Sequence, residues 1–170
     1  MQAVCTITQS SEGVRGCIMF TEQRGKVRVE CRLSGFTNKN TLRGFHIHES
    51  GDLRFSDATG CCAHFNPTGE SHGGRTGRFG PFEVVNTKRH VGDLGNIYVD
   101  GNGYSTTTFT DSMIALRGSH NIIGRSVVIH EHEDDLGKTN HPLSSTTGNS
   151  GARVAAGVIG YASVCDHWAF

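Results

Sequence analysis

The chain has 170 residues, 35% of them hydrophobic, and its 16 Lys and Arg side chains balance 16 Asp and Glu side chains to a formal net charge of zero. This length suits one domain, and the composition excludes a disordered chain, a coiled coil and collagen. A neutral balance argues against nucleic acid as a partner, and no apolar stretch approaches the roughly 18 residues of a membrane helix. We therefore expect neither nucleic acid nor a membrane as a partner. The ten histidines are the unusual feature.

Period-two alternation of apolar and polar residues runs through the chain and predicts eight strands, at 3–8, 14–20, 26–33, 42–49, 95–99, 104–110, 124–130 and 153–161. Between the fifth and sixth, Asp100–Gly103 predicts a hairpin turn, because Gly and Asn accept positive φ. Eight mostly antiparallel strands indicate an all-β Greek-key barrel or sandwich. Segments 50–93 and 131–151 do not alternate, and loops of this length are usually functional.

The N-terminus and the cysteines indicate a reducing compartment. Residues 1–5 lack the basic and apolar regions of a secretory leader, which favours a cytoplasmic protein. A viral protein acting in the host cytoplasm, or a leader removed before Met1, remains an alternative. The six cysteines form no CxxC pair, which favours free thiols.

The histidines form a candidate metal constellation. His46 and His48 share one face of a predicted strand, and His130 ends another strand. Three more histidines and an acid follow in the first long loop: His64, His72, His90 and Asp93. Each residue alone is a weak signal, since such histidines are more often surface or core residues. Together, imidazole and carboxylate suit zinc or copper better than magnesium or calcium.

Nine motifs along the chain resemble copper/zinc superoxide dismutase, in order and in register from about Ala3 to Ala162. They are Gly44–Glu49, Gly51–Asp52, His64–Pro67, His72–Gly74, Arg89–Asn96, Ile122–Glu131, Asp134–Lys138, Thr147–Arg153 and Gly157–Gly160. The resemblance implies an eight-stranded antiparallel Greek-key β-barrel, related to the immunoglobulin-like sandwich, with two long functional loops. It implies a superoxide dismutase domain at 1–162 and a C-terminal extension at 163–170.

The resemblance also implies the cofactors and the site. Copper is expected on His46, His48, His64 and His130, and zinc on His64, His72, His90 and Asp93. His64 would bridge the two ions, and Asp134 would link a copper histidine to a zinc histidine. Arg153 would guide the superoxide anion, because its guanidinium stays cationic. The implied reaction is ping-pong, with Cu(II)/Cu(I) cycling, transient protonation of His64, structural zinc, and dioxygen and hydrogen peroxide as products.

The cysteines depart from the family pattern. The family's intrasubunit disulfide has no counterpart, because Ala156 stands at one of its positions and the loop cysteines have moved to Cys61 and Cys62. A reduced enzyme is the expectation. A pairing of Cys61 or Cys62 with Cys165 is the alternative, and the copper donor is unknown.

Two loops also depart from the family. His72 and His90 are 18 residues apart, about twice the family's separation. We expect the inserted region Arg75–Phe82 to bulge into solvent, with a contact surface as the alternative. In the steering loop, Pro142, Leu143 and Thr146 replace charged residues of the family, which predicts a shallower dependence of the rate on salt.

The remaining expectations concern partners and rivals. His120, His132, His141 and His167 are expected to be surface or hydrogen-bonding residues. The family's pairing of barrels predicts a homodimer. A non-enzymatic copper module and a structural zinc protein without redox function are the rival functions.

Overall fold

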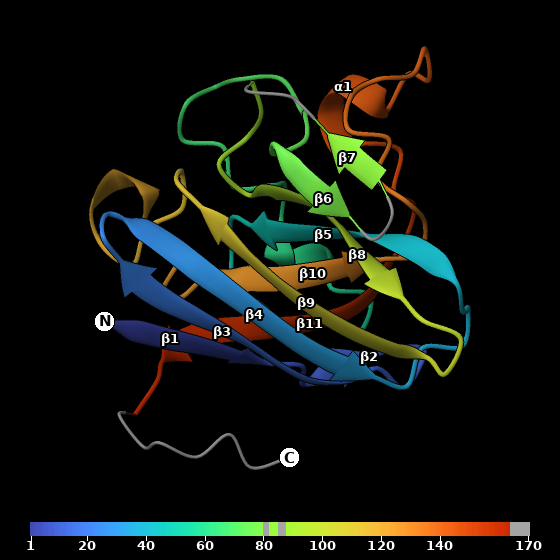
Figure 1. Ribbon diagram of the computed structural model, residues 1–170, viewed down its shortest axis with the longest axis horizontal. Helices are drawn as coiled ribbons and strands as arrows, with labels where there is room; N and C mark the ends of the chain where they lie inside the picture. The colour runs from blue at the N-terminus through green and yellow to red at the C-terminus, as the bar shows by residue number, and fades with distance from the viewer. Residues whose placement is uncertain (80–81, 85–87, 164–170) are drawn as a thin grey trace.

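The structure, a computed structural model, describes residues 1–79, 82–84 and 88–163 as an antiparallel β-barrel (Figure 1). Eight strands follow one another around the sheet in the order β8-β5-β10-β11-β1-β3-β4-β9. Their bounds are β1 Gln2–Thr6, β3 Arg15–Gln23, β4 Lys26–Ser34, β5 Thr41–His48, β8 Asp93–Val99, β9 Tyr104–Asp111, β10 Ser126–His130 and β11 Arg153–Tyr161. The predicted all-β barrel and its eight strands are confirmed.

Alternation along each strand fills the barrel interior. On β4, Val27, Val29, Cys31 and Leu33 are buried, whereas the residues between them are exposed or half-buried. Strand β5 differs because both of its faces are covered. Phe45 and Ile47 enter the main core, and the alternate residues His46 and His48 are buried beneath loops on the outer face.

The predicted hairpin is only partly correct. Asp100 and Gly103 form the turn, with hydrogen bonds from Asp100 N to the Tyr104 carbonyl at 2.8 Å and from Gly103 N to the Asp100 carbonyl at 3.1 Å. Among the described residues, however, no ladder joins β8 to β9: β8 pairs with β5, and β9 pairs with β4. Each of the two strands is therefore laddered on one edge only, and the barrel is nearly closed rather than continuous at this seam.

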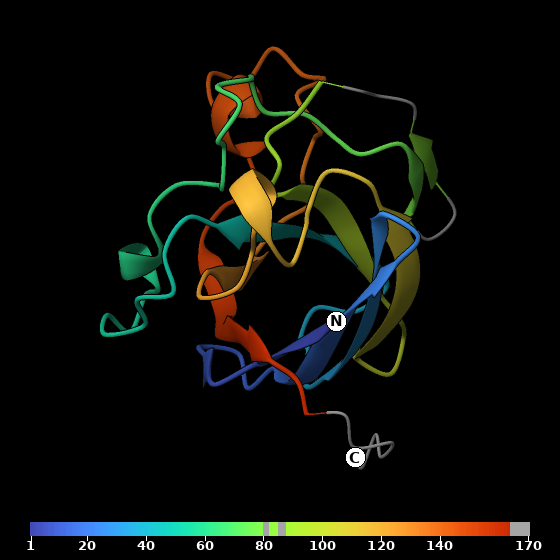
Figure 2. The same ribbon diagram turned by 90° about the vertical axis from the view of Figure 1, so that its left-hand side faces the viewer.

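The two long loops gather outside one wall of the barrel, and Figure 2 shows much of their backbone above the ring of the sheet. The loops carry the short elements η1 Thr59–Cys61, β6 Gly77–Phe79, β7 Phe82–Val84 and α1 Ser144–Thr147. Two further short elements lie in other connections: β2 Gln9–Ser10, which pairs with β11, and η2 Gly118–His120. Among the described residues, no helix has the length and apolar character needed to span a bilayer.

The insertion does not simply bulge into solvent, which corrects the expectation at Arg75. This side chain is 5% exposed, its Nε donates to the Leu94 carbonyl at 3.0 Å, and its guanidinium lies 3.7 Å from the centroid of the Phe109 ring. β6 and β7 then pair as a short hairpin. A cation placed on a core-strand aromatic anchors the beginning of the insertion, a contact that spacing alone could not reveal. The alternative expectation, a contact surface formed by the arginines and phenylalanines of the insertion, concerns side chains beyond Arg75 that lie outside the described ones.

Candidate metal centre

Three histidines lie on the adjacent strands β5 and β10. In the β5–β10 ladder, His46 pairs with Val128 and His48 with Ser126, so the two imidazoles stand on the outer face of the barrel. His130 closes β10 at a bulge between Ile129 and His130. All three side chains are at most 4% exposed.

The other predicted site residues come from the loop that covers this face. His64 forms an isolated bridge with His48, and Asp93 begins β8 opposite His46. The structure brings the predicted residues together in two buried clusters whose ligand atoms lie within 4.8 Å of one another. They are His46, His48, His64 and His130 in one cluster, and His64, His72, His90 and Asp93 in the other. His64 belongs to both.

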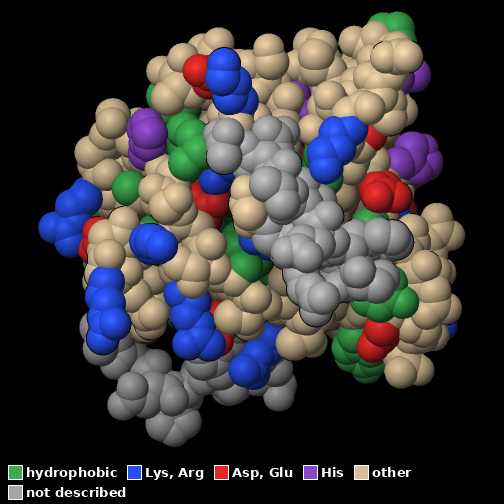
Figure 3. All heavy atoms as spheres, turned by 45° about the horizontal axis from the view of Figure 1, so that its top comes forward, with side chains coloured by type: hydrophobic (Ala, Val, Ile, Leu, Met, Phe, Trp, Pro, Cys, Tyr) green, Lys and Arg blue, Asp and Glu red, His purple; other side chains and the backbone are tan. Residues whose placement is uncertain are grey.

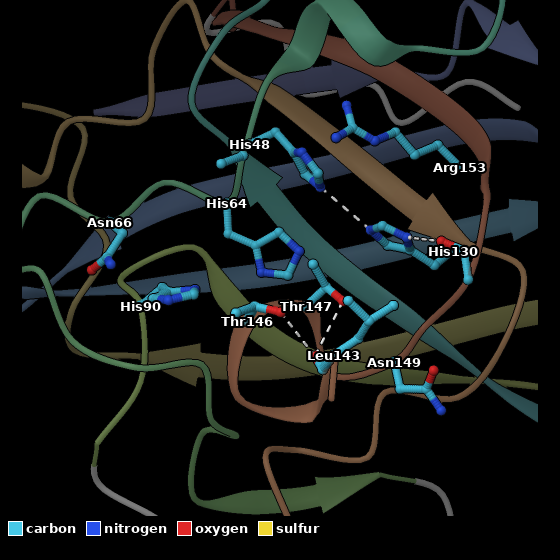
Figure 4. A pocket seen from close by; sticks show the side chains of 12 residues that line it. His48, His64, Asn66, His90, His130, Leu143, Thr146, Thr147, Asn149 and Arg153 are labelled. Carbon is cyan, nitrogen blue, oxygen red and sulfur yellow. Dashed lines mark hydrogen bonds between the residues drawn. The ribbon is translucent and has the colours of Figure 1, made fainter. Parts of the chain in front are cut away.

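The first cluster contains two imidazole nitrogens that face each other without a proton to share (Figure 4). His48 Nδ1 donates to the Cys62 carbonyl at 2.9 Å, and His130 Nδ1 donates to the Gly151 carbonyl at 3.2 Å. Those bonds place the proton of each neutral ring on Nδ1 and leave a lone pair on each Nε2. The two Nε2 atoms are 3.3 Å apart. Two lone pairs at this distance repel unless a cation lies between them.

Further buried nitrogens in the cluster lack partners. His46 Nδ1 and His64 Nε2 are inaccessible to solvent and make no hydrogen bond. An unsatisfied buried polar atom is costly and is rare in a folded protein. Four nitrogens with available lone pairs are therefore directed at one region, which is the donor set that copper prefers.

The second cluster surrounds the Asp93 carboxylate. His64 Nδ1 and His90 Nδ1 lie 2.8 and 3.1 Å from Asp93 Oδ1, and His72 Nδ1 lies 3.0 Å from Oδ2. Three imidazoles and one carboxylate match a closed, tetrahedral zinc site. The donor set thus fits a redox-inert divalent ion beside a copper-type site.

Asp134 connects the two clusters. Its Oδ2 accepts from His46 Nε2 and its Oδ1 from His72 Nε2, each at 2.8 Å, and its side chain is fully buried. Asn96 holds the backbone of Asp134 with two bonds, Nδ2 to the carbonyl at 2.9 Å and Oδ1 from the amide at 2.8 Å. Such a carboxylate fixes the tautomer of both rings, so that Nδ1 of each is directed at its cluster.

Burial sets the protonation of the first cluster, and charge sets that of the second. Burial, followed by the neighbouring imidazoles, holds the pKa of His48 and of His130 well below the usual value, so both rings are neutral at pH 7. Burial alone would also lower the pKa of His72, but hydrogen bonds from its ring to Asp134 and Asp93 raise it to about 10. A neutral imidazole beside a region of lone pairs is ready to bind a cation.

A cavity of ≈ 490 Å³ opens onto both clusters. It is lined by His48, His64, His90 and His130, by Arg153, and by loop residues such as Leu143, Thr146, Thr147 and Asn149. Arg153 Nη1 and Nη2 donate to the Ala58 and Cys62 carbonyls, each at 2.6 Å, and Figure 4 shows its side chain extending beside His48 and His130. A fixed cation thus lies at the cavity wall.

The histidines outside the clusters have ordinary surroundings. His120 Nδ1 donates to the Met113 carbonyl at 2.8 Å, His141 Nδ1 accepts from the Leu143 amide at 3.2 Å, and His132 is exposed. Figure 3 shows histidine side chains reaching the surface at the periphery of the loop-covered face. The expectation is confirmed for these three, whereas His167 lies outside the described residues. So do the proposed partner Cys165 and the extension beyond residue 163.

Four residues that contact the site escaped sequence reasoning: Arg43, whose Nη1 donates to the His130 carbonyl at 3.3 Å, Arg89, Asn96 and Cys62 through its peptide. Arg89 pairs with Asp111 and donates to the carbonyls of His90 and Asp93, at 3.2 and 2.9 Å. One sequence signal existed, since Arg43 occupies the inward row of β5 with Phe45 and Ile47. The hydrogen bonds to backbone carbonyl oxygens could not be predicted from the sequence, because every residue type carries this oxygen.

The chain was compared with known proteins. A sequence model described as copper/zinc superoxide dismutase (SODC) matches residues 14–159. A Cu-Zn superoxide dismutase of Paramecium bursaria Chlorella virus 1 is 47% identical over 149 residues, which cover 88% of this chain and 74% of that protein. Superoxide dismutase (Cu-Zn) 2 of Brassica juncea is 46% identical over 156 residues, covering 91% and 94%.

A solved structure agrees with the fold. The crystal structure of the clock protein EA4 superposes with a TM-score of 0.82 at 44% sequence identity, and covers 95% of this chain and 94% of that one. The family model and the curated relatives agree on one family. The chain belongs to the copper/zinc superoxide dismutase family.

Proposed function

We propose that this protein is a superoxide dismutase that uses copper and zinc. Two superoxide anions and two protons give one dioxygen and one hydrogen peroxide. The observation that carries the proposal is the pair of Nε2 lone pairs of His48 and His130, 3.3 Å apart and with both rings anchored through Nδ1. This arrangement is unfavourable without a bound cation, and it lies on the wall of the cavity.

The copper set follows from the nitrogens with available lone pairs, and the zinc set from the nitrogens that surround the Asp93 carboxylate. Copper is assigned to His46 Nδ1, His48 Nε2, His64 Nε2 and His130 Nε2, and zinc to His64 Nδ1, His72 Nδ1, His90 Nδ1 and Asp93. Copper supplies the one-electron oxidation and reduction of superoxide, and zinc supplies a redox-inert charge that orders the loop. Asp134 keeps His46 and His72 in the tautomer that each set needs.

Arg153 and His64 are the residues that act on the substrate, Arg153 by attracting the anion and His64 by donating a proton. The Arg153 guanidinium is held by two backbone carbonyls, so it presents a fixed positive charge to an entering anion. His64 lines the cavity, and when its Nε2 is not bound to copper that nitrogen would take a proton and donate it to the peroxide product. Both groups stabilise an anion in the cavity, which promotes the binding of superoxide and the formation of hydrogen peroxide.

The quaternary structure and location belong to the same proposal. Val158 and Tyr161 on β11 are 40% and 66% exposed, and Phe55, in the connection between β5 and η1, is 52% exposed. Apolar side chains of this size at the surface support a homodimer through this face. We also propose a cytoplasmic location and a single domain at 1–162. Light scattering of the purified protein tests the dimer, and a monomer at micromolar concentration would contradict it.

The decisive experiment measures metal content and superoxide decay on one sample. We expect about one copper and one zinc per chain, with rapid decay of a superoxide pulse. Copper binding without decay would mean a binding module. Zinc alone, with no uptake of added copper, would mean a structural zinc protein.

A further inference from the structure

A fully buried arginine lies behind the copper-type cluster. Arg43 sits on β5 between Leu42 and Gly44, and none of its side chain is exposed. Its strand position shares the inward row of Phe45 and Ile47, and its guanidinium lies 5.9 Å from the centroid of the Phe36 ring. A permanent cation in such a place needs hydrogen-bond acceptors and a counter-charge.

The acceptors are the carbonyl oxygens of a bulge that includes a cluster histidine. Ile129 pairs with Phe45, but the next donor on β5, Gly44 N, bonds to the His132 carbonyl at 2.8 Å. The chain therefore bulges at residues 130 and 131. Arg43 Nη1 donates to the carbonyls of both, to His130 at 3.3 Å and to Glu131 in a short contact. The side chain replaces the backbone donors that a regular ladder would provide.

The counter-charge comes from a distant part of the chain. Glu12, in the connection between β2 and β3, accepts from Arg43 Nη2 through both carboxylate oxygens, at 3.3 and 3.0 Å. Thr37 Oγ1 also donates to this carboxylate, at 3.4 Å. Because a guanidinium is planar and forked, it can bond the carboxylate with one amino group and the two carbonyls with the other.

We propose that Arg43, neutralised by Glu12, is a positioning residue that sets the direction of the His130 imidazole. The bulge determines where the His130 side chain leaves the strand, and the second support of the ring is the single 3.2 Å bond from Nδ1 to the Gly151 carbonyl. Arg43 therefore acts on copper geometry through the backbone, without touching a metal or the substrate. This inference rests on the proposed copper site.

The arrangement of Arg89 provides a contrast within the same protein. Arg89 donates to the carbonyls of His90 and Asp93, so its loss is expected to disturb the zinc set. Arg43 contacts only the copper set among the ligands. A residue that merely stabilises the barrel would weaken both metals together, whereas a positioning residue for His130 affects copper selectively.

The test compares the fully loaded wild type with Arg43→Met, Arg43→Lys and Glu12→Gln. Copper and zinc dissociation constants are measured by chelator competition, and the Cu(II) site is recorded by electron paramagnetic resonance. We expect Arg43→Met to weaken copper binding on the order of 10- to 100-fold, with an altered copper hyperfine splitting and unchanged zinc binding. Arg43→Lys should be intermediate, because one ammonium cannot reproduce the fork. Arg28→Met, on the outer barrel face, is the matched control.

The outcomes separate the two proposals. A wild type that binds no copper refutes the proposed function itself. If the wild type binds copper but Arg43→Met and Arg43→Lys keep its affinity and spectrum, or if copper and zinc weaken equally, the inference is wrong. Should Arg43→Met fail to fold, Arg43→Lys and Glu12→Gln decide, because Lys still fills the buried Arg43 site and Gln keeps the size of the half-buried Glu12 side chain.

Discussion

His48 and Arg153 donate to the same oxygen, the carbonyl of Cys62, at 2.9 and 2.6 Å. One peptide group thus orients a proposed copper ligand and the proposed anion guide together. Cys62 holds this carbonyl with φ 64° and ψ −149°, a backbone region that strongly favours glycine. A strained residue thus holds the oxygen to which both side chains donate.

Replacing the strained residue tests that relationship. We expect Cys62→Gly to stabilise the protein against unfolding by about 1 kcal/mol, because relief of about 1–3 kcal/mol of strain exceeds the roughly 0.5–1 kcal/mol entropic cost of glycine. Superoxide turnover should be retained, since the carbonyl remains. Urea denaturation gives the free energy of unfolding. Ala63→Gly, one residue further and without positive φ, is the control and should destabilise. Equal effects at both positions would refute the strain.

Asp134→Asn should weaken the binding of both metals. An amide offers one oxygen, so one of His46 and His72 loses its acceptor and meets an NH2 group instead. Loss of such a support typically costs roughly 10- to 100-fold in affinity. Chelator competition measures both metals, and the neighbouring exposed Glu133→Gln should leave them unchanged. Unaltered zinc affinity in Asp134→Asn would contradict the linking role.

The cavity mouth predicts a shallow dependence of kcat/KM on salt. Leu143 is 51% exposed at the lining, beside Thr146 and Thr147, and Arg153 is the cavity's fixed cation. An added unit charge about 10 Å from the anion changes its energy in water by about 0.4 kcal/mol, or about twofold in rate. We therefore expect Leu143→Lys to raise kcat/KM about twofold at low salt and to steepen its salt dependence, and Leu143→Glu to do the reverse. Stopped-flow decay of superoxide over a salt series checks this, with Leu143→Gln as the neutral control. Equal slopes in all variants would remove the electrostatic explanation.

The thiols are expected to differ sharply in reactivity. Burial raises the pKa of Cys5 to about 12 and raises that of Cys31 as well, whereas Cys62 is exposed. A thiol that stays protonated and covered reacts slowly. A maleimide pulse followed by peptide mapping should label Cys62 and leave Cys5 and Cys31 unlabelled until the protein is unfolded. Labelling of Cys31 in the native protein would contradict its burial.

Intact mass before and after reduction addresses the missing disulfide. Ala156 lies in a small apolar cluster with Ala58, Cys61 and Val128, and the structure has Cys61 and Cys62 as free thiols. We expect no change in mass on reduction. If reduction instead adds the mass of two hydrogens to the wild type but not to Cys165→Ser, Cys165 is paired with one of the loop cysteines.

The strands and the histidine constellation could be read from the sequence because both depend on local pattern. Alternation such as Val27, Val29, Cys31 and Leu33 places side chains on opposite faces whatever the rest of the chain does. The ligand types, His46 and His48 above all, likewise restrict the metal by their chemistry. These features needed no knowledge of which strands are neighbours.

The tertiary structure alone decided the contacts that cross large distances in sequence. The turn at Asp100–Gly103 depends on local sequence, and it forms. Strand pairing depends on distant parts of the chain, and β8 pairs with β5 whereas β9 pairs with β4. Arg43 reaches Glu12 and His130, and Arg75 reaches Phe109, by packing that no spacing encodes. The sequence by itself determined which side chains could bind metal. Only the folded chain decided which nitrogens were left without a proton or a partner, because hydrogen bonding and burial depend on what the fold brings beside each group.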